Sequence, residues 1–164
     1  MVCGADNDFG LHARFFVLEA GTDEAAPSAV AAQAELLGVF TPAPHHQSYP
    51  GRLHGGISTA ILDETIGRAI LIAQPDVWGV TAEFTVRFRA PVPLEGEVRA
   101  LARITRDTRR LFEGTGEIVL DDGTVAVEAR GRYVKMRLGD IAPEMARDTE
   151  WFADARDTPG EIEI

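Results

Sequence analysis

The segment from about Gly56 to Ala73 limits the possible folds more than any other part of the sequence. Read at helical spacing, it has apolar side chains on all sides, and a helix of this kind is buried over most of its surface. Pro75 ends it, because proline cannot continue the hydrogen-bond ladder. The chain must therefore supply a layer wide enough to enclose one long helix. The apolar residues are Ile57, Ala60, Ile61, Leu62, Ile66, Ala69, Ile70, Leu71 and Ala73.

The residues after this helix read as four strands. From Gly79 to Pro91 the sequence alternates, as is typical of a strand with one buried face. Further strands are expected at 98–105, 111–120 and 124–136, and short connections between successive strands predict an antiparallel meander. A long helix against such a sheet is an α+β fold. The alternation puts Val80, Ala82, Phe84, Val86, Phe88 and Ala90 on one face, and Thr81, Glu83, Thr85, Arg87 and Arg89 on the other.

The first fifty residues are less regular. Residues 11–19 read as a strand. Residues 28–40 fit a helix by their alanine content and a strand by their alternation. Residues 41–52 contain three prolines and Gly51, so we expect an irregular loop near a site.

Composition limits the function as well. A chain of 164 residues suits one domain, and a formal charge of −10 argues against nucleic acid or an anionic membrane as the main partner. One cysteine, Cys3, allows no internal disulfide, as is usual in the cytoplasm, and we expect neither a signal peptide nor a membrane span. We expect one domain at 1–139 and an acidic tail at 140–164, with a short helix around Glu144–Phe152.

The sequence His54-Gly55-Gly56 stands where the buried helix begins. The first amides of a helix have no intrahelical acceptor, and a residue without a Cβ atom lets a ligand oxygen approach them. The helix dipole adds a positive potential at the same end. These features predict an oxyanion hole, and a tight turn that requires glycine is the alternative.

Asp63 and Glu64 follow two turns later and differ in their surroundings. Glu64 has Arg68 at i+4, which favours an ion pair on the helix surface. Asp63 has no cation at i±3 or i±4, so it either reaches solvent or is desolvated on a largely apolar helix. A desolvated carboxylate suits general-base or nucleophilic work. The alternative is a structural aspartate bonded to a loop amide or to the hydroxyl of Thr59.

Other chemistries find little support in the sequence. His45 and His46 diverge in an extended chain, and neither an HExxH motif nor a cysteine pair accompanies them, so we expect no metal site. Ser58 is not in a GxSxG elbow, and no glycine-rich phosphate motif is present.

The run Tyr49-Pro50-Gly51-Arg52-Leu53-His54-Gly55-Gly56, with Asp63-Glu64 downstream, resembles the hotdog-fold acyl-CoA thioesterases of the phenylacetyl-CoA (PaaI-like) type. The strand VTAEFTVRFRAPV, the ending GRYVKM and the start Cys3-Gly4-x-x-Asn7-x-x-Gly10-Leu11 are similar to that family too. The resemblance covers about residues 3–137. It implies a hotdog fold, in which an antiparallel sheet of about five to six strands wraps a long central helix, and a strand at 29–41. It also implies a homodimer or homotetramer with active sites at subunit interfaces.

The resemblance assigns roles to single residues. Asp63 is similar to the base or nucleophile, Gly55 to the oxyanion donor, and His54 to the residue that shapes the turn and touches the thioester. Thr81 matches a Ser/Thr position that helps to orient water from the other subunit. Ser48 stands where some relatives have Asn, so His46 or Gln47 is expected to supply that polar contact. The candidates for substrate binding are Gly56, His46, Gln47, Ser48, Glu64, Arg109 and Arg110.

The implied function is hydrolysis of an acyl-CoA thioester, with no cofactor beyond the coenzyme A of the substrate. Arginine suits phosphate, so arginines among Arg87, Arg103, Arg106, Arg109 and Arg110 are candidates for the coenzyme A phosphates. Three alternatives stay open: a non-catalytic hotdog that binds acyl-CoA or small carboxylates, a dehydratase or hydratase, and a structural dimer whose acidic tail recruits a partner.

Overall fold

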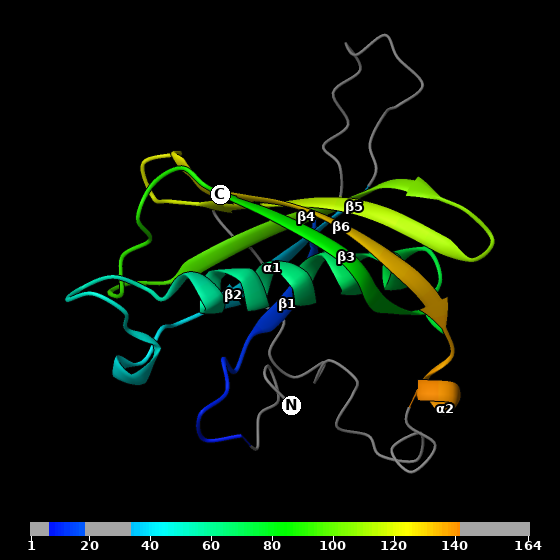
Figure 1. The fold of residues 1–164 in the computed structure, drawn as a ribbon, viewed down its shortest axis with the longest axis horizontal. Helices are drawn as coiled ribbons and strands as arrows, with labels where there is room; N and C mark the ends of the chain where they lie inside the picture. The colour runs from blue at the N-terminus through cyan, green and yellow to red at the C-terminus, as the bar shows by residue number, and fades with distance from the viewer. Residues whose placement is uncertain (1–6, 19–33, 142–164) are drawn as a thin grey trace, which may run out of the picture.

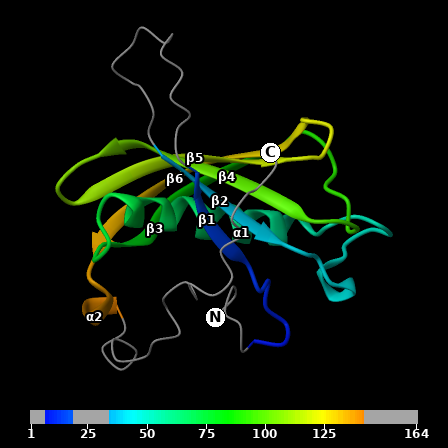
Figure 2. The same ribbon diagram turned by 180° about the vertical axis from the view of Figure 1, so that it is seen from behind.

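The structure, a computed structural model, describes residues 7–18 and 34–141. The elements in chain order are β1 (Arg14–Leu18), β2 (Glu35–Phe40), the 3-10 helix η1 (Pro44–His46), α1 (Gly55–Ala69), the 3-10 helix η2 (Ile70–Ile72), β3 (Trp78–Phe88), β4 (Val98–Asp107), β5 (Leu111–Val119), β6 (Val125–Met136) and α2 (Leu138–Ile141). The strands form one antiparallel sheet in the order β1-β2-β4-β5-β6-β3, and α1 lies along one of its faces (Figures 1 and 2). The expected α+β hotdog fold, with one long helix against a sheet of five to six strands, is confirmed.

The central helix lies where its apolar residues predict it. Its α-helical part runs from Gly55 to Ala69, and η2 continues it as a tighter turn before Pro75. Ile61, Leu62 and Ile66 are fully buried between the helix and the sheet. The sheet therefore encloses the apolar side chains of this helix.

The N-terminal half agrees with the sequence where it is described. β1 falls inside the strand expected at 11–19, and β2 shows that residues 35–40 of the ambiguous stretch form a strand. Cys3, residues 19–33 and the tail helix expected at 144–152 lie outside the described residues. In the described part of the chain, no helix is both long and apolar enough to cross a membrane.

The predicted meander is wrong for its first strand. β4, β5 and β6 do pair in sequence order, but β3 pairs with β6 at the edge of the sheet. The connection at 89–97 is not a hairpin, because its backbone bonds to the loop before α1: Leu53 N donates to Val92 O (3.0 Å) and Leu94 N to Gly51 O (3.1 Å). The chain thereby passes the start of the helix on its way from the sheet edge to the sheet centre.

The predicted alternation is wrong at Thr81. Thr81 is the register partner of Tyr133, but the next pair is Glu83 with Arg132, so Ala82 is an extra residue in β3. This bulge turns Thr81 toward α1, on the same face as Phe84, while Glu83 faces the outer surface. Bulges of this kind re-aim side chains and are frequent beside active sites.

Glycines on β5 let the helix approach the sheet closely. A Cβ atom on Gly114 would lie 2.6 Å from Ile66 Cγ2 and 2.9 Å from the Arg103 carbonyl oxygen. Gly116 would meet the same isoleucine side chain at 3.0 Å. The close approach of α1 to β5 at Ile66 therefore depends on these two small residues.

Candidate active site

The start of α1 leaves one backbone amide available. His54 is the N-cap, and its Nδ1 accepts a hydrogen bond from Gly56 N (2.9 Å). The His54 carbonyl accepts bonds from the amides of Ile57 and Ser58. Among the described residues, the Gly55 N–H has no acceptor, so this amide can serve a ligand oxygen.

An aromatic ring lies against Gly55. A Cβ atom on Gly55 would be 3.3 Å from both Cε1 and Cζ of Phe88, the last residue of β3. Phe88 is 55% exposed, which leaves much of its ring free to contact a ligand. The free amide and the ring together form a half-polar, half-apolar corner at the helix start.

Asp63 lies further along α1 and is held by two hydroxyl groups. Thr81 Oγ1 lies 3.0 Å from Asp63 Oδ1 and 3.2 Å from Oδ2, and Tyr133 OH donates to Oδ1 at 3.0 Å. No ion pair to Asp63 occurs within residues 7–18 and 34–141, which agrees with the lack of a cation one helical turn away in the sequence. The alternative bond to Thr59 does not form, because that hydroxyl donates to the Gly55 carbonyl instead (2.9 Å).

The sequence interpretation missed Tyr133. Its side chain is 1% exposed, and its ring stacks on Phe112 with centroids 4.9 Å apart. Burial raises the pKa of Tyr133 well above its usual value, and the negative charge of Asp63 raises it further. The phenol therefore stays neutral and donates a hydrogen bond to the Asp63 carboxylate. One available signal was its inward position in the alternation of 124–136, because a buried tyrosine hydroxyl usually needs a partner.

Glu64 forms the ion pair that its spacing predicts. Its Oε2 lies 3.2 Å from Arg68 Nε, and the Arg68 guanidinium also lies over the rings of Phe15 and Trp78. The two neighbouring acids thus have different surroundings. Glu64 is neutralised by a cation, whereas Asp63 is hydrogen-bonded by neutral donors.

The loop before α1 uses its polar side chains to hold its own shape. His46 is buried, and its Nδ1 accepts a bond from Ala43 N (3.0 Å), while its carbonyl accepts one from His54 N (2.9 Å). Burial lowers the pKa of His46, and the charge of neighbouring His45 acts in the same direction. Gln47 Oε1 accepts from Gly51 N (3.0 Å), and Ser48 N donates to the Arg52 carbonyl. Substrate contacts by these residues stay a prediction.

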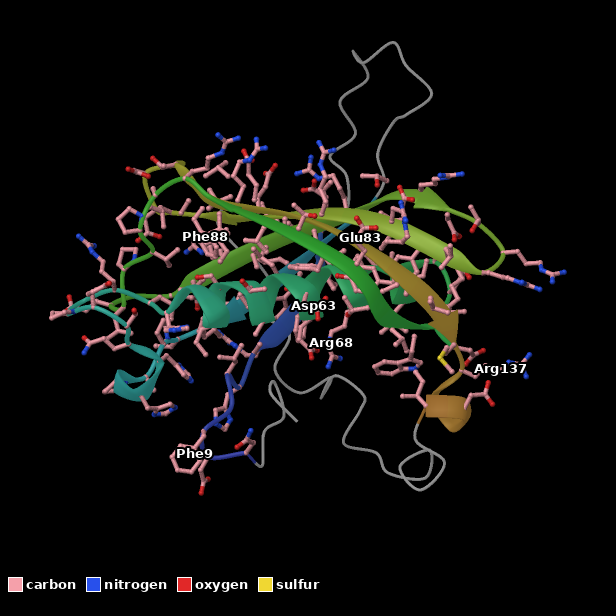
Figure 3. All side chains as sticks on the ribbon, viewed as in Figure 1. Phe9, Asp63, Arg68, Glu83, Phe88 and Arg137 are labelled. Atoms are coloured by element: carbon pink, nitrogen blue, oxygen red, sulfur yellow. The ribbon has the colours of Figure 1, made fainter. Side chains whose placement is uncertain are left out.

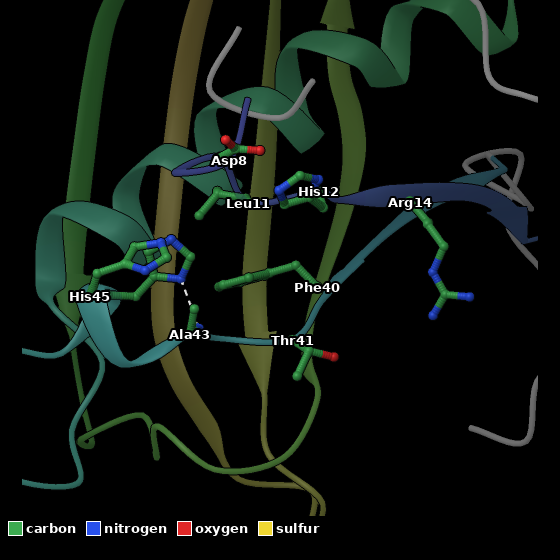
Figure 4. A pocket seen from close by; sticks show the side chains of 10 residues that line it. Asp8, Leu11, His12, Arg14, Phe40, Thr41, Ala43 and His45 are labelled. Atoms are coloured by element: carbon green, nitrogen blue, oxygen red, sulfur yellow. Dashed lines mark hydrogen bonds between the residues drawn. The ribbon is translucent and has the colours of Figure 1, made fainter. Parts of the chain in front are cut away.

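A cavity of about 340 Å³ lies beside this loop, between the N-terminal segment and the end of β2 (Figure 4). Its lining includes Asp8, His12, Phe40 and His45. Among the described residues, no group of three or more His, Cys, Asp or Glu side chains could hold a metal ion.

The candidate arginines divide into two groups. Arg103 pairs with Glu35 (3.0 Å), and Arg106 lies 3.7 Å from Glu113. Arg109 and Arg110 are exposed in the turn between β4 and β5 and form no ion pair within the described part of the chain. Arg87, which is exposed on β3, belongs with this second group, and these three arginines are free to meet a phosphate without first breaking a bridge in the described part of the chain.

Within one chain, Gly55 and Asp63 are too far apart to act on one carbonyl group. They are separated by eight residues of α1, about 12 Å along the axis at a rise of about 1.5 Å per residue. Figure 3 shows Asp63 in the middle of the helix, with Phe88 toward the helix start. A single subunit thus carries two halves of a site at separate places.

Residues 50–127 match the family model described as the thioesterase superfamily. Over these residues the chain is similar to this superfamily. It is 29% identical over 99 residues to the acyl-coenzyme A thioesterase THEM4 of Bos taurus, which covers 60% of this chain. The aligned part is only 40% of that relative's length.

Solved structures of other proteins have the same fold. A conserved protein from Pseudomonas aeruginosa superimposes with a TM-score of 0.58 at 25% identity, covering 62% of this chain and 81% of its own. The putative thioesterase yhdA of Lactococcus lactis gives a TM-score of 0.65 at 18% identity, covering 77% of this chain and 95% of its own. At that identity, the second likeness concerns the fold alone.

Proposed function

We propose that this chain is a thioester hydrolase of the PaaI-like type that acts on acyl-CoA. The observation that carries the proposal is Asp63, a carboxylate that two neutral hydroxyls hold and that has no cationic partner among residues 7–18 and 34–141. The free amide of Gly55 and the superfamily match support it. The THEM4 relative is named for hydrolysis of acyl-coenzyme A, which supports the same substrate class here.

The complete site forms between two subunits. About 12 Å separates Asp63 from Gly55 along α1, so the carbonyl polarised at Gly55 of one subunit meets Asp63 of the other. The free edge of β3 supports this arrangement, since a long exposed edge strand readily pairs with another chain. Val80 and Phe88 on that strand are exposed apolar residues in one subunit. The proposed assembly is a homodimer, and two dimers would make a tetramer.

The chemistry starts with the thioester oxygen accepting a hydrogen bond from Gly55 N–H at the positive end of α1. The Asp63 carboxylate takes a proton from water as the water oxygen attacks the carbonyl carbon. The resulting oxyanion is stabilised at Gly55, by about 3 kcal/mol for one donor of this kind. The C–S bond then breaks, and coenzyme A leaves with the electron pair as a thiolate. In the alternative route, an Asp63 oxygen attacks the carbonyl carbon first and the C–S bond breaks to release the coenzyme A thiolate, and water then cleaves the resulting anhydride.

Other residues of the site bind and orient the substrate. Thr81 holds the Asp63 carboxylate and helps to place the attacking water. His54 fixes the turn that exposes Gly55. Gly56, His46, Gln47, Ser48 and Glu64 border the thioester, and Arg109 and Arg110 meet the coenzyme A phosphates.

The test is thiol release from a panel of acyl-CoAs by the wild type and by Asp63→Asn. General-base catalysis typically contributes roughly 10²–10⁴-fold, so we expect the variant to lose at least 100-fold in kcat with an unchanged melting temperature. Turnover by Asp63→Asn close to that of the wild type would contradict the mechanism. A wild type that binds acyl-CoAs without hydrolysing any would indicate the non-catalytic alternative.

The phosphate contact has a separate test. Reversing the charge of Arg109 and Arg110 together to Glu should raise KM for acyl-CoA roughly tenfold, because two cations that meet phosphate are lost. A short thioester without the nucleotide should keep its KM. An unchanged KM for acyl-CoA would remove these arginines from the site.

A further inference from the structure

Tyr133 approaches Asp63 from the strand opposite Thr81. Its hydroxyl lies 3.0 Å from Asp63 Oδ1 and 3.3 Å from the Asp63 carbonyl oxygen. Each hydroxyl has a single proton to donate, and Thr81 lies nearer to Oδ1 than to Oδ2. The two donors therefore concentrate on Oδ1, and Oδ2 keeps more of its capacity to accept a proton.

The ring of Tyr133 lies in a slot that glycines create. A Cβ atom on Gly131 would overlap the Tyr133 ring, and one on Gly67 would lie 3.4 Å from Tyr133 Cε1. On its other side the ring stacks on Phe112 at an interplanar angle of 10°. Gly79 in turn leaves room for Phe112, whose Cζ would lie 2.6 Å from a Cβ atom there. The helix and two strands thus contribute small residues that hold this phenol flat and aimed at Asp63.

We propose that Tyr133 is the positioning residue for the catalytic carboxylate: it holds Asp63 by Oδ1 and leaves Oδ2 as the oxygen that acts on water or on the thioester. This inference rests on the function proposed above. It adds a residue that touches neither substrate nor water and acts through Asp63. Thr81 and Tyr133 face each other in register, so the bulge at Ala82 and the glycine slot serve the same side chain.

The charged groups around this pair are few. On α1 itself, Glu64 is the other acid that acts on Tyr133, and Arg68 pairs with it. From β3 and β6, the groups that bond to Asp63 are the two hydroxyls. Arg132 pairs with Glu83 and with Glu113 on the opposite face of the sheet. Among the described residues, the phenol and the Thr81 hydroxyl are thus the donors that hold the Asp63 carboxylate.

The experiment compares pH–rate profiles of the full-length wild type and Tyr133→Phe. Losing a donor to the ionised carboxylate disfavours the ionised form, so the acidic limb should move to higher pH by roughly one unit. We expect kcat to fall about tenfold while KM stays within about twofold, because the phenol touches no substrate. The control is Tyr49→Phe, which removes the hydroxyl of a 78% exposed tyrosine and should leave the profile unchanged.

A second measurement changes the donor without removing it. The chain has two tyrosines, so in the Tyr49→Phe background Tyr133 is the only one. Replacing it by a fluorotyrosine during expression gives a more acidic phenol in the same slot. A stronger donor should move the acidic limb to lower pH, opposite to Tyr133→Phe.

The two proposals fail in different ways. Loss of turnover in Asp63→Asn, together with an unmoved acidic limb in both Tyr133 variants, would overturn the role of Tyr133 alone. Full turnover in Asp63→Asn would overturn the mechanism itself. Opposite shifts in the two Tyr133 variants support the positioning role, since a merely structural tyrosine would move both variants in one direction or neither.

Discussion

Carboxylates have opposite surroundings on the two faces of the sheet. On the outer face, arginines neutralise them: Arg132 lies 3.2 Å from Glu83 and 3.3 Å from Glu113, and Arg89 lies 2.9 Å from Glu128. On the inner face, Asp63 has two neutral hydroxyls and no ion pair within the described residues. Figure 3 shows the charged side chains extending outward from the sheet, with Asp63 between sheet and helix.

The difference has a chemical consequence. An exposed carboxylate beside an arginine forms a weak surface ion pair. The arginine neutralises its negative charge. A carboxylate held by hydroxyls keeps its charge and its orientation, so it remains able to accept a proton. Acidic residues are therefore paired with arginine on the outer face, whereas Asp63 on the inner face is available for proton transfer.

The largest expected effect comes from placing a cation on the inner face. Thr81→Lys should place an ammonium group against Asp63 and make this site resemble the outer face. We expect kcat for acyl-CoA hydrolysis to fall by at least about 100-fold, comparable with removing a general base. The measurement is thiol release at saturating substrate.

Thr85→Lys is the matched control for that variant. Thr85 lies on the same strand but on the outer face, where it pairs in register with Arg130. Its activity should stay within about twofold of the wild type. Equal losses in both variants would mean that strand β3, and not the cation at Asp63, limits activity.

A smaller effect is expected on stability at β5. Gly114→Ala introduces a Cβ atom against Ile66 and the backbone of Arg103, and overpacking of this kind costs roughly 1–3 kcal/mol. Thr115→Ala, at the next residue and on the other face, should change the free energy of unfolding by less than about 0.5 kcal/mol. Urea denaturation of both variants checks the contrast, and similar losses would show that the inner face is not the tighter one.

The sequence predicted the elements better than their long-range arrangement. The helix, the strands and the two glycines of His54-Gly55-Gly56 follow from local periodicity and backbone requirements. The pairing of β3 with β6 does not, because the two strands are far apart in the sequence and the segment after β3 bonds to the loop before α1 instead of forming a hairpin. The bulge is equally hidden, since Ala82 is small enough to suit either face.

The candidate site shows the same division. Asp63 stands out in the sequence because no cation lies one helical turn away, and that absence is local information. Tyr133 and Thr81 reach it only through tertiary structure, one through a glycine slot and the other through a register shift. Sequence reasoning therefore finds the reactive group more readily than the groups that orient it.

The smallest expected effect is on the outer-face ion pairs. Arg132→Gln removes the bridges to Glu83 and Glu113, which are between about one third and two thirds exposed, and exposed pairs typically contribute roughly 0–1 kcal/mol. We expect a loss of free energy of unfolding below about 1 kcal/mol that shrinks further at high salt, because salt screens exposed charges. Arg130→Gln is the control, since Arg130 lies on the same strand and face without an ion pair in the described part of the chain. Neither variant should change kcat. A large loss of activity in Arg132→Gln would mean that the two faces are coupled through β6, which carries both Arg132 and Tyr133, and the contrast between them would no longer hold.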